Sequence, residues 1–443
     1  MVLFVQYRHM RVKRLTHNED LLRDEEIATA TSIALAATEQ LIASIQYPAR
    51  SIMDTSLAFL LSAALGVVSA SSTAEIIREA GPEGCHIDKI AEKNGMDPMK
   101  IGRVLRPLAT RHIFREVSPN VFAHNRISAL LDTGKSSEEV LAAPEDKHQG
   151  AQGFAAIVGL NTDETFKAAA YIEDVVINPS REEPADELNT PLNRAFNTHV
   201  DLFSWYERPE NRIRFRRFGM AMDASRKVQP PGVQSKGFDW ESLPKDALVL
   251  DVGGGVGSTS LEIARTNPHL KFMVQDKEAV IHEGKEHWER ELPGALEMGL
   301  VSFQVHDFFN PQPVKHADVF MLRYIVHDWS DEYALKILKH LRDAAQPTTI
   351  LLVLERIIPF VCGEDTAYED IPGAISAHTS PHPLLANMGV MIPYLVDMQM
   401  MALLNGCERT LPHFSKLLEE AGWGIQQIYP GAGPLDQLIA KPI

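Results

Sequence analysis

Three glycines that alternate with single residues follow an apolar run in the middle of the chain. The run Val249–Val252 has the composition of a buried strand, and Gly253, Gly255 and Gly257 then open a helix. Glycine lets the backbone approach a ligand where a Cβ atom would collide, and the amides at a helix start donate to polar ligand groups. A dinucleotide fingerprint of the G-x-G-x-x-G type would require glycine at Ser258. The spacing therefore favours another nucleotide-type cofactor. The alternative is a strand-to-helix turn that binds nothing.

An acid ends the next strand-like run, Phe272–Asp276. It lies about twenty residues after the glycines, where the acid of a nucleotide-binding fold holds the ribose hydroxyls. Asp276 is therefore a candidate ribose ligand.

A histidine and two glutamates form a second candidate group. His327 follows the apolar strand Val319–Arg323, at the sheet edge where doubly wound proteins bind ligands. A neutral imidazole there can accept a proton from a substrate hydroxyl, and a carboxylate nearby raises its basicity. Glu355 ends the next apolar strand, and Glu408 follows a helical run; together they could orient His327. A structural histidine and two helix-capping acids are the alternative.

Composition limits the class of protein. The chain has 443 residues, 45% of them hydrophobic, with 43 basic and 59 acidic residues and a net charge of -16. This length suits two or three domains, and the charge argues against general affinity for nucleic acid or anionic membranes. Three cysteines without a C-x-x-C pair predict neither a disulfide framework nor a zinc site, so we expect a cytoplasmic protein.

Two N-terminal segments resemble targeting or membrane segments. The apolar run from 57 to 70 is shorter than the about twenty residues of a membrane span, so we expect a buried packing helix there. The basic opening, Met1 to Arg14, is expected to be a loose extension, with a transit peptide as the alternative.

The order of elements predicts an α/β protein. Residues 1–133 form an N-terminal, mostly helical domain, residues 134–235 a helical connecting and substrate-wall region, and residues 236–443 a doubly wound Rossmann-like domain with a parallel sheet. Strands are expected near 248–252, 271–275, 301–305, 319–323, 349–355 and 426–429.

Short helices and a hairpin in the N-terminal domain predict a winged helix. The helices lie near 87–91 and 100–106, and the hairpin strands near 113–117 and 121–123. A winged helix can place its second helix in the DNA major groove, but acidic residues alternate with the arginines here. We therefore expect a packing or dimerisation role, with DNA binding as the weaker alternative.

Taken together, these motifs resemble the caffeic-acid-type O-methyltransferases of plants and fungi, most closely those of larger fungi. These enzymes use S-adenosylmethionine (SAM) and release S-adenosylhomocysteine. The resemblance covers most of the chain. Its motifs are Asp251 to Gly257, Asp276, His306-Asp307-Phe308-Phe309, His327-Asp328-Trp329, Glu355 and Glu408-Arg409-Thr410. The segments Arg103–Arg106 and His112–Glu116 match the winged-helix dimerisation domain of that family, which implies a homodimer.

The resemblance also implies a role for each matching residue. His327 would be the catalytic base, flanked by Glu355 and Glu408. The cofactor would be bound by Asp251, Gly253, Gly255, Gly257, Asp276, Asp307, Phe308 and Arg323, the last standing where the family often has lysine. Phe218, Met222 and Asp328 would contact substrate; ordinary core packing is the alternative for the first two.

The expected reaction is transfer of a methyl group to a hydroxyl of a small aromatic metabolite. It needs no metal, because a methyl group on a sulfonium is already activated. The pair His378 and His382 is interrupted by prolines and is not expected to bind metal. Residues 361–387 are expected to form an irregular lid or dimer-contact loop. An alternative reaction is pericyclic or dehydrative chemistry on the same fold with SAM bound.

Overall fold

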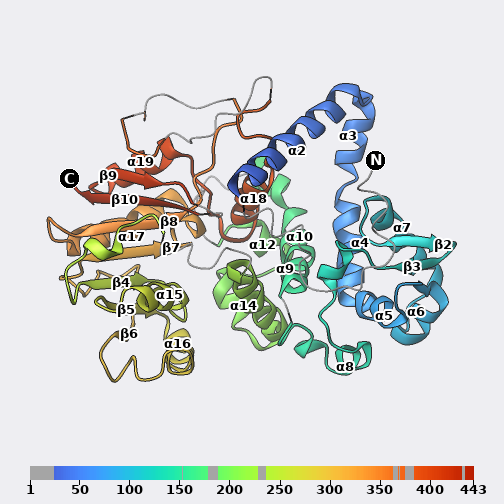
Figure 1. Ribbon diagram of the computed structural model, residues 1–443, viewed down its shortest axis with the longest axis horizontal. Coiled ribbons are helices and arrows are strands. Elements are labelled where there is room, and N and C mark those ends of the chain that lie inside the picture. The colour runs from blue at the N-terminus through green and yellow to red at the C-terminus, as the bar shows by residue number, and fades with distance from the viewer. Residues whose placement is uncertain are drawn as a thin grey trace. The chain divides into compact units, whose positions relative to one another are not determined.

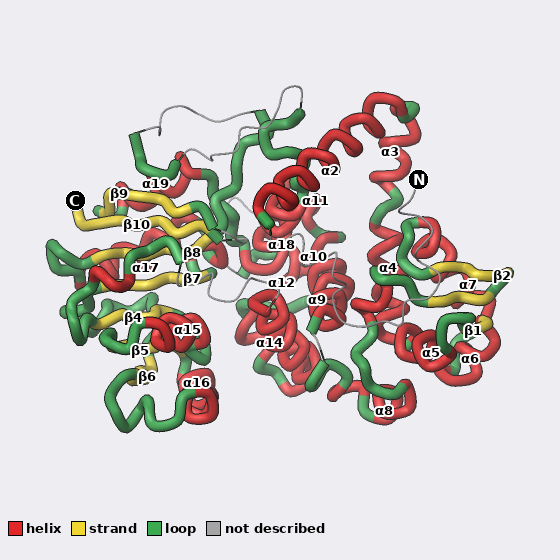
Figure 2. The backbone as a smooth tube through the Cα atoms, viewed as in Figure 1, coloured by secondary structure: helices red, strands yellow, loops and turns green. Residues whose placement is uncertain are grey.

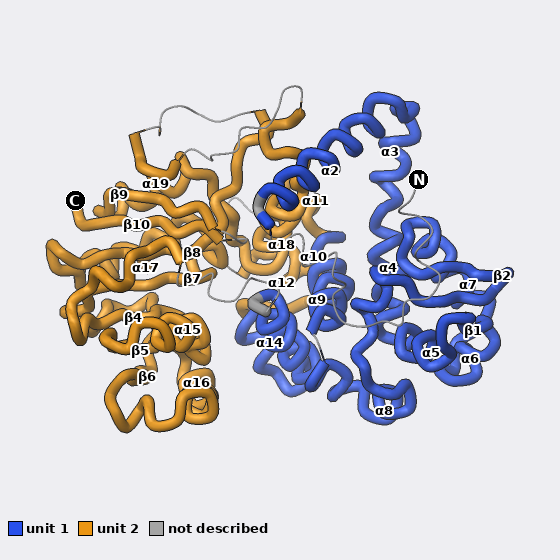
Figure 3. Tube along the Cα trace, viewed as in Figure 1, with its two compact units in different colours: residues 1–170, 202–228 blue, residues 171–201, 229–443 orange. Residues whose placement is uncertain are grey.

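The chain forms two compact units, which are coloured separately in Figure 3. The computed structural model describes residues 24–151, 153–177, 188–227, 236–362, 368, 370–374, 384–431 and 435–443. Unit 1 comprises residues 1–170 and 202–228, and unit 2 comprises residues 171–201 and 229–443. The expected connecting region, residues 134–235, is therefore shared between the two units. The basic opening of the chain and the pair His378 and His382 lie outside the described residues.

Unit 1 is mostly helical and carries a small antiparallel sheet in the order β1-β3-β2 (Figures 1 and 2). The expected short helices are present as α6 and α7, and the hairpin as β2 and β3. Asp97 caps α7 by accepting from the amide of Lys100, and Pro98 opens the helix. The strands are β1 (Cys85–His86), β2 (Arg115–Ser118) and β3 (Val121–Ala123). The helices are α2 (Glu25–Ile45), α3 (Pro48–Ser56), α4 (Phe59–Ala70), α5 (Thr73–Ala80), α6 (Ile87–Asn94), α7 (Pro98–Thr110), α8 (Ser137–Ala142), α9 (Phe154–Leu160), α10 (Phe166–Ala169), α13 (Leu202–Tyr206) and α14 (Arg212–Lys227).

The apolar run from 57 to 70 is only partly the buried packing helix expected from the sequence. Ala64 and Val68 of α4 are buried in the core of unit 1, but Leu57, Phe59 and Leu60 are about half exposed. The expectation is thus wrong for the start of the run, because no described part of the chain covers it. The helical stretch Pro48–Ala70 is long and apolar enough to cross a membrane by length and composition alone, and it is mostly exposed.

Unit 2 is built on a seven-stranded sheet in the order β6-β5-β4-β7-β8-β10-β9. The five strands from β6 to β8 in this order are parallel, whereas β10 is antiparallel to both β8 and β9. The strands are β4 (Leu248–Val252), β5 (Lys271–Asp276), β6 (Val301–Val305), β7 (Val319–Arg323), β8 (Ile350–Glu355), β9 (Trp423–Tyr429) and β10 (Asp436–Pro442).

All six expected strands are present, and β10 is an addition that the sequence analysis missed. Only Leu438, Ile439 and Ala440 form a continuous apolar run there, and a lysine and a proline follow. An apolar run of three residues is too short to predict a strand. Pairing with β8 over Asp436–Ala440 makes it a strand and turns the edge of the sheet antiparallel.

Helices cover both faces of the sheet, and each face has its own core. Leu250 and Val252 of β4 pack with the inner faces of α17 and α19, while Val249 packs with α15 and α16 on the opposite face. This alternation follows from the two-residue period of a strand. The helices of unit 2 are α11 (Ile172–Ile177), α12 (Pro191–Ala195), α15 (Ser258–Thr266), α16 (Glu278–Glu291), α17 (Asp331–Ala344), α18 (Ile392–Leu404) and α19 (Leu411–Glu420).

Parallel strands bring the candidate residues to one edge. Strands β4, β5, β7 and β8 end at Val252, Asp276, Arg323 and Glu355. Their carboxyl ends therefore meet, and the glycine turn follows the first of them. This is the edge at which doubly wound sheets bind ligands.

Candidate functional site

The glycine turn has the backbone geometry expected of a ligand cradle. Gly253, Gly255 and Gly257 have φ angles of 68°, 61° and 75°, a region that other residues adopt only with strain. A Cβ atom on Gly257 would lie 2.6 Å from Nε1 of Trp288, so a side chain there would also collide with α16. The amides of Gly253 and Gly254 donate to the carbonyl of Gln275, which ties the turn to the end of β5.

Asp276 lies directly against this turn. Its Oδ2 accepts from the amide of Gly255 at 2.8 Å, and its Oδ1 accepts from the amide of Lys277 at 2.7 Å. Burial raises the pKa of this carboxyl, although the two amides favour its charged form. Each carboxylate oxygen keeps a further lone pair, so Asp276 can still accept from ligand hydroxyls. A glycine cradle beside an acceptor at the end of β5 fits a nucleoside.

The remaining candidate cofactor residues lie around the turn. Asp251 is buried under it and accepts from the hydroxyl of Ser260 at 2.6 Å, and burial raises its pKa to about 6. The ring of Phe308 lies 3.4 Å from the position that a Cβ atom on Gly253 would take. Asp307 accepts from the amide of Phe309, and the charge of Arg323 acts on Asp251. The structure thus gathers these residues at one turn; their contacts with a cofactor stay a prediction.

His327 lies in a short 3₁₀ turn, Val326–Asp328, between β7 and α17. Glu355 is fully buried, and its Oε1 accepts from the amides of Ile325 and Val326 at 2.9 and 2.8 Å, and from that of His327 at 3.4 Å. This is the contact of a capping acid, so in the described structure Glu355 holds the backbone of the turn rather than hydrogen bonding to the imidazole. Tyr324, three residues before His327, has a φ angle of 53°, and its ring centroid lies 5.0 Å from that of His327.

Two other carboxylates reach the imidazole itself. Nδ1 of His327 lies 2.9 Å from Oε1 of Glu408, and Nε2 lies 3.3 Å from Oδ1 of Asp328. Burial alone lowers the pKa of His327, which is 9% exposed, but the charges of the surrounding carboxylates outweigh it and raise this pKa to about 10. Burial also raises the pKa of Asp328 and of Glu355 to about 6. The site is a buried cluster in which a proton is held strongly by the imidazole.

The sequence analysis missed residues that hold this arrangement. Gly406 has no space for a side chain, because a Cβ atom there would lie 2.2 Å from the carbonyl oxygen of His327. Asp397 of α18 accepts from the amide of Glu408 at 2.8 Å. Arg409 is fully buried and donates to two carbonyls of the histidine turn. Arg409 is part of the motif Glu408-Arg409-Thr410, but the sequence does not indicate its partners, because they are about 80 residues away in the chain.

The predicted substrate-wall residues belong to the other compact unit. Phe218 is half-buried in a cluster on α14 and stacks on Tyr206 at 5.0 Å, and Met222 is 44% exposed. Phe218 thus takes part in core packing, which was the alternative explanation for these two residues. Their contact with substrate stays a prediction. Most of the expected loop 361–387 lies outside the described residues.

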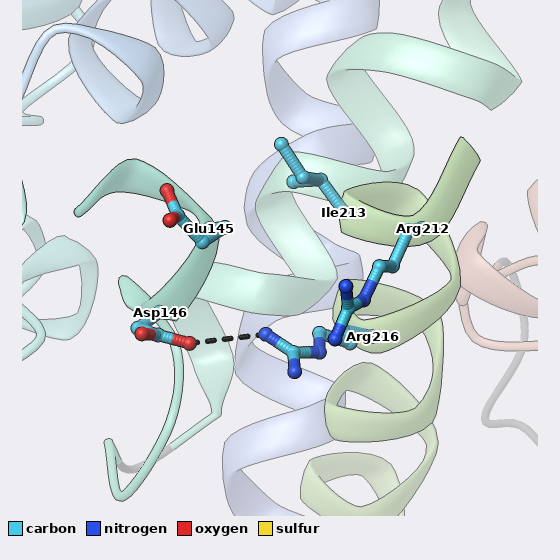
Figure 4. A pocket seen from close by; sticks show the side chains of 5 residues that line it. All are labelled: Glu145, Asp146, Arg212, Ile213 and Arg216. Carbon is cyan, nitrogen blue, oxygen red and sulfur yellow. Dashed lines mark hydrogen bonds and ion pairs between the residues drawn. The ribbon is translucent and has the colours of Figure 1, made fainter. Parts of the chain in front are cut away.

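A pocket in unit 1 is separate from this chemistry. It is lined by Glu145, Asp146, Arg212, Ile213 and Arg216, and Arg216 donates to Asp146 at 3.1 Å (Figure 4). None of the five is a candidate site residue, so we assign no function to the pocket.

Donor atoms of His327, Glu355 and Glu408 lie within 4.8 Å of one another, close enough for a metal ion. However, Oε1 of Glu355 already accepts from backbone amides, and Nδ1 of His327 is at hydrogen-bond distance from Glu408. A second group of this kind among the described residues, Asp331, Cys407 and His413, includes an aspartate that already pairs with Arg409. Oε2 of Glu355 and Oε2 of Glu408, however, are buried without a hydrogen-bond partner among the described residues. Independence from a metal therefore stays a prediction.

Comparison with known proteins finds relatives that cover most of the chain. A family of O-methyltransferase domains matches residues 185–370. The chain is 40% identical over 435 residues to an O-methyltransferase of Armillaria gallica, covering 96% of this chain and 92% of that protein. It is 39% identical over 415 residues to a 4-O-methyltransferase of Phanerochaete chrysosporium, covering 93% and 88%.

Solved structures share the fold at lower identity. A pericyclic reaction enzyme superposes with a TM-score of 0.68 at 18% identity, covering 96% of this chain and 97% of that one. An O-methyltransferase of neocarzinostatin biosynthesis, in complex with S-adenosylhomocysteine and 1,4-dihydroxy-2-naphthoic acid, has a TM-score of 0.62 at 18% identity, covering 87% and 96%. The N-terminal helical unit and the mostly parallel sheet are therefore a known combination.

Proposed function

The chain belongs to the family of S-adenosylmethionine-dependent O-methyltransferases, and we propose that it methylates a hydroxyl of a small phenolic metabolite, with His327 as general base and without a metal. The observation that carries this proposal is the buried imidazole held between Glu408 and Asp328 at the edge of the sheet. The cofactor supplies an activated methyl group on a positively charged sulfur. The protein must align a substrate oxygen and take its proton.

The electrostatics of His327 suit a phenol. A phenolic hydroxyl has a pKa near 10, and the carboxylates raise the pKa of His327 to about 10. Proton transfer from the phenol to the neutral imidazole is therefore close to balanced. Because an imidazole with this pKa is mostly protonated at neutral pH, we expect turnover to rise as the pH increases toward 10. An aliphatic hydroxyl, with a pKa several units higher, would not transfer its proton as readily. A related enzyme in complex with a dihydroxynaphthoic acid supports an aromatic substrate.

Each group at the site has a role in this proposal. Glu408 holds Nδ1, which turns Nε2 toward the acceptor, and Asp328 beside Nε2 contacts the substrate. Glu355 holds the amides of the histidine turn. The cofactor would be held by the glycine turn, by Asp276 at its ribose, by Asp307 and Phe308 at its adenine, and by Asp251 and Arg323 near the turn.

We also propose that the protein is a cytoplasmic homodimer formed through its N-terminal helices. Large apolar side chains on α2 and α3 are exposed in the single chain, among them Leu41, Ile45 and Ile52. Leu57, Phe59 and Leu60, which follow in the chain, are about half exposed as well, and exposed apolar surface of this kind marks interaction sites. A second copy of the chain is the partner that the resemblance in this domain implies.

A pericyclic or dehydrative reaction is the second candidate, supported by the fold shared with the pericyclic reaction enzyme. It would use the bound cofactor without consuming it. The retained base and both glutamates favour methyl transfer.

The test is transfer of labelled methyl from SAM to a panel of mono- and dihydroxylated aromatics. We expect transfer by the wild type and at least about a 10²-fold lower turnover by His327→Ala, with SAM affinity unchanged within about twofold. Transfer that does not depend on His327 would contradict the assigned base. SAM binding without transfer to any phenol would shift the function to the second candidate.

A further inference from the structure

Arg409 holds carbonyls of the turn that carries His327, whereas Glu355 holds its amides. Its Nη1 donates to the carbonyl of Val326 at 2.7 Å, and its Nη2 donates to the carbonyl of Trp329 at 2.8 Å. These are the residue before His327 and the second residue after it. Glu355 holds amides of the same turn. One buried carboxylate therefore holds amides, and one buried guanidinium holds carbonyls, of a single short turn.

The remaining donors of this guanidinium are used as well. Nε and Nη2 both donate to Oδ1 of Asp331, at 3.1 and 3.0 Å, and Nη1 also donates to the carbonyl of Cys407 at 3.4 Å. All five N–H groups of the arginine thus have an acceptor. A buried cation costs free energy unless it is fully paired, and a lysine cannot reproduce five donors in one plane.

The position of Arg409 in the chain links it to the ring of His327. Its neighbour, Glu408, holds Nδ1, so adjacent residues of one segment fix the ring and the backbone of the same histidine. The segment is itself anchored, because the carbonyl of Arg409 accepts from the amide of Ile358 just beyond β8. We infer that Arg409 is a positioning residue for methyl transfer: it fixes the backbone around His327 so that Nε2 points at the acceptor hydroxyl.

This inference rests on the proposed function and can fail separately from it. The test compares Arg409→Lys with Arg342→Lys, a matched control. Arg342 in α17 also donates to carbonyls, those of Gly422 and Ile443, but neither of these residues belongs to the histidine turn. For each variant, kcat, KM, SAM affinity, the pH dependence of kcat and the melting temperature would be measured.

We expect Arg409→Lys to lower the limiting kcat at high pH at least about tenfold with SAM affinity unchanged within about twofold. The acidic limb of its kcat–pH profile should move to lower pH, because an imidazole that leaves Glu408 loses the charge that raises its pKa. Arg342→Lys should lower the melting temperature without changing kcat by more than about twofold. An unshifted profile and wild-type kcat in Arg409→Lys, or an equal loss in Arg342→Lys, would overturn the inference.

A second variant covers the case in which Arg409→Lys does not fold. Asp331 is 56% exposed at its side chain, so Asp331→Ala should fold, and it releases two of the five donors of Arg409. We expect a several-fold lower kcat and a shift of the profile in the same direction, whereas His413→Ala, which removes the other partner of Asp331, should leave both unchanged. Wild-type behaviour of Asp331→Ala would overturn the inference. His327→Ala in the same series separates the two proposals, since full turnover there would overturn the base itself.

Discussion

Nδ1 of His327 lies 2.9 Å from Oε1 of Glu408, although 81 positions separate these residues in the chain. This contact determines which ring nitrogen can act on a ligand, because an imidazole held at Nδ1 has only Nε2 left for that. It also places a negative charge where it stabilises the imidazolium. The orientation and the basicity of the proposed base therefore have one shared cause.

Replacing Glu408 by glutamine should lower the basicity of His327 while keeping a hydrogen-bond acceptor in place. The negative charge raises the pKa of His327, so its loss should move the acidic limb of the kcat–pH profile to lower pH and reduce the limiting kcat at high pH about tenfold. Steady-state kinetics between pH 6 and pH 11 would measure both. Glu419→Gln on α19 is the control, since Glu419 accepts from Ser415 and touches no site residue. A profile that does not move in Glu408→Gln would contradict this account.

Asp276→Ala should weaken SAM binding at least about tenfold and leave the base intact. The variant loses an acceptor for the ribose hydroxyls and the bond from the amide of Gly255 that shapes the turn. Calorimetric titration with SAM measures the effect. Asp246→Asn is a suitable control, because Asp246 is exposed, pairs with Lys271 at the opposite end of the same strand, and has a positive φ that asparagine tolerates. Equal affinity in Asp276→Ala and the wild type would disprove the ribose assignment.

The charged cluster predicts how stability changes with pH. The pKa of His327 is raised in the folded protein to about 10 from an ordinary value near 6.5. The folded state therefore binds this proton more tightly, and the stabilisation is complete below pH 6.5 and disappears as pH rises to 10. The difference in melting temperature between wild type and His327→Asn should be largest near pH 6 and smallest near pH 10. A difference that is constant over this range would rule out the raised pKa.

Removal of divalent metals should leave turnover unchanged. Oε1 of Glu355 accepts from backbone amides, Nδ1 of His327 is held by Oε1 of Glu408, and methyl transfer from a sulfonium needs no Lewis acid. The measurement is methyl transfer after exhaustive treatment with a chelator, with and without added Mg²⁺ or Zn²⁺. Loss of activity that a metal restores would replace the general-base mechanism by metal activation of the hydroxyl.

Charges on the exposed N-terminal helices should separate the proposed dimer. Ile45 and Ile52 are 74% and 71% exposed in the single chain, so Ile45→Glu with Ile52→Glu should be tolerated by the monomer and disfavour a covered apolar interface. Light scattering after gel filtration should show the mass of a dimer for the wild type and of a monomer for the double variant. Met298→Glu, at an exposed apolar position of unit 2, should remain a dimer. A monomeric wild type would exclude the proposed dimer.

The sequence by itself predicted the strands and helices that have strong local patterns. The strand before Gly253, the acid that ends β5 and the alternation of strands and helices depend on neighbouring residues, so their pattern is visible in a single chain. The carboxyl-edge location of Asp276, His327 and Glu355 followed from the same alternation, since parallel strands end together. The added strand β10 had no such signal, because its pairing with β8 comes from residues about 80 positions away.

The tertiary structure alone decided what each polar group at the site contacts. The sequence placed Glu355 and Glu408 near His327 but could not distinguish a partner of the ring from a cap of the backbone. The fold makes Glu408 the first and Glu355 the second. It also brings Arg409 to the carbonyls of Val326 and Trp329. Hydrogen bonds require distances within a few tenths of an ångström and particular directions, and across 80 residues only the packed chain sets them.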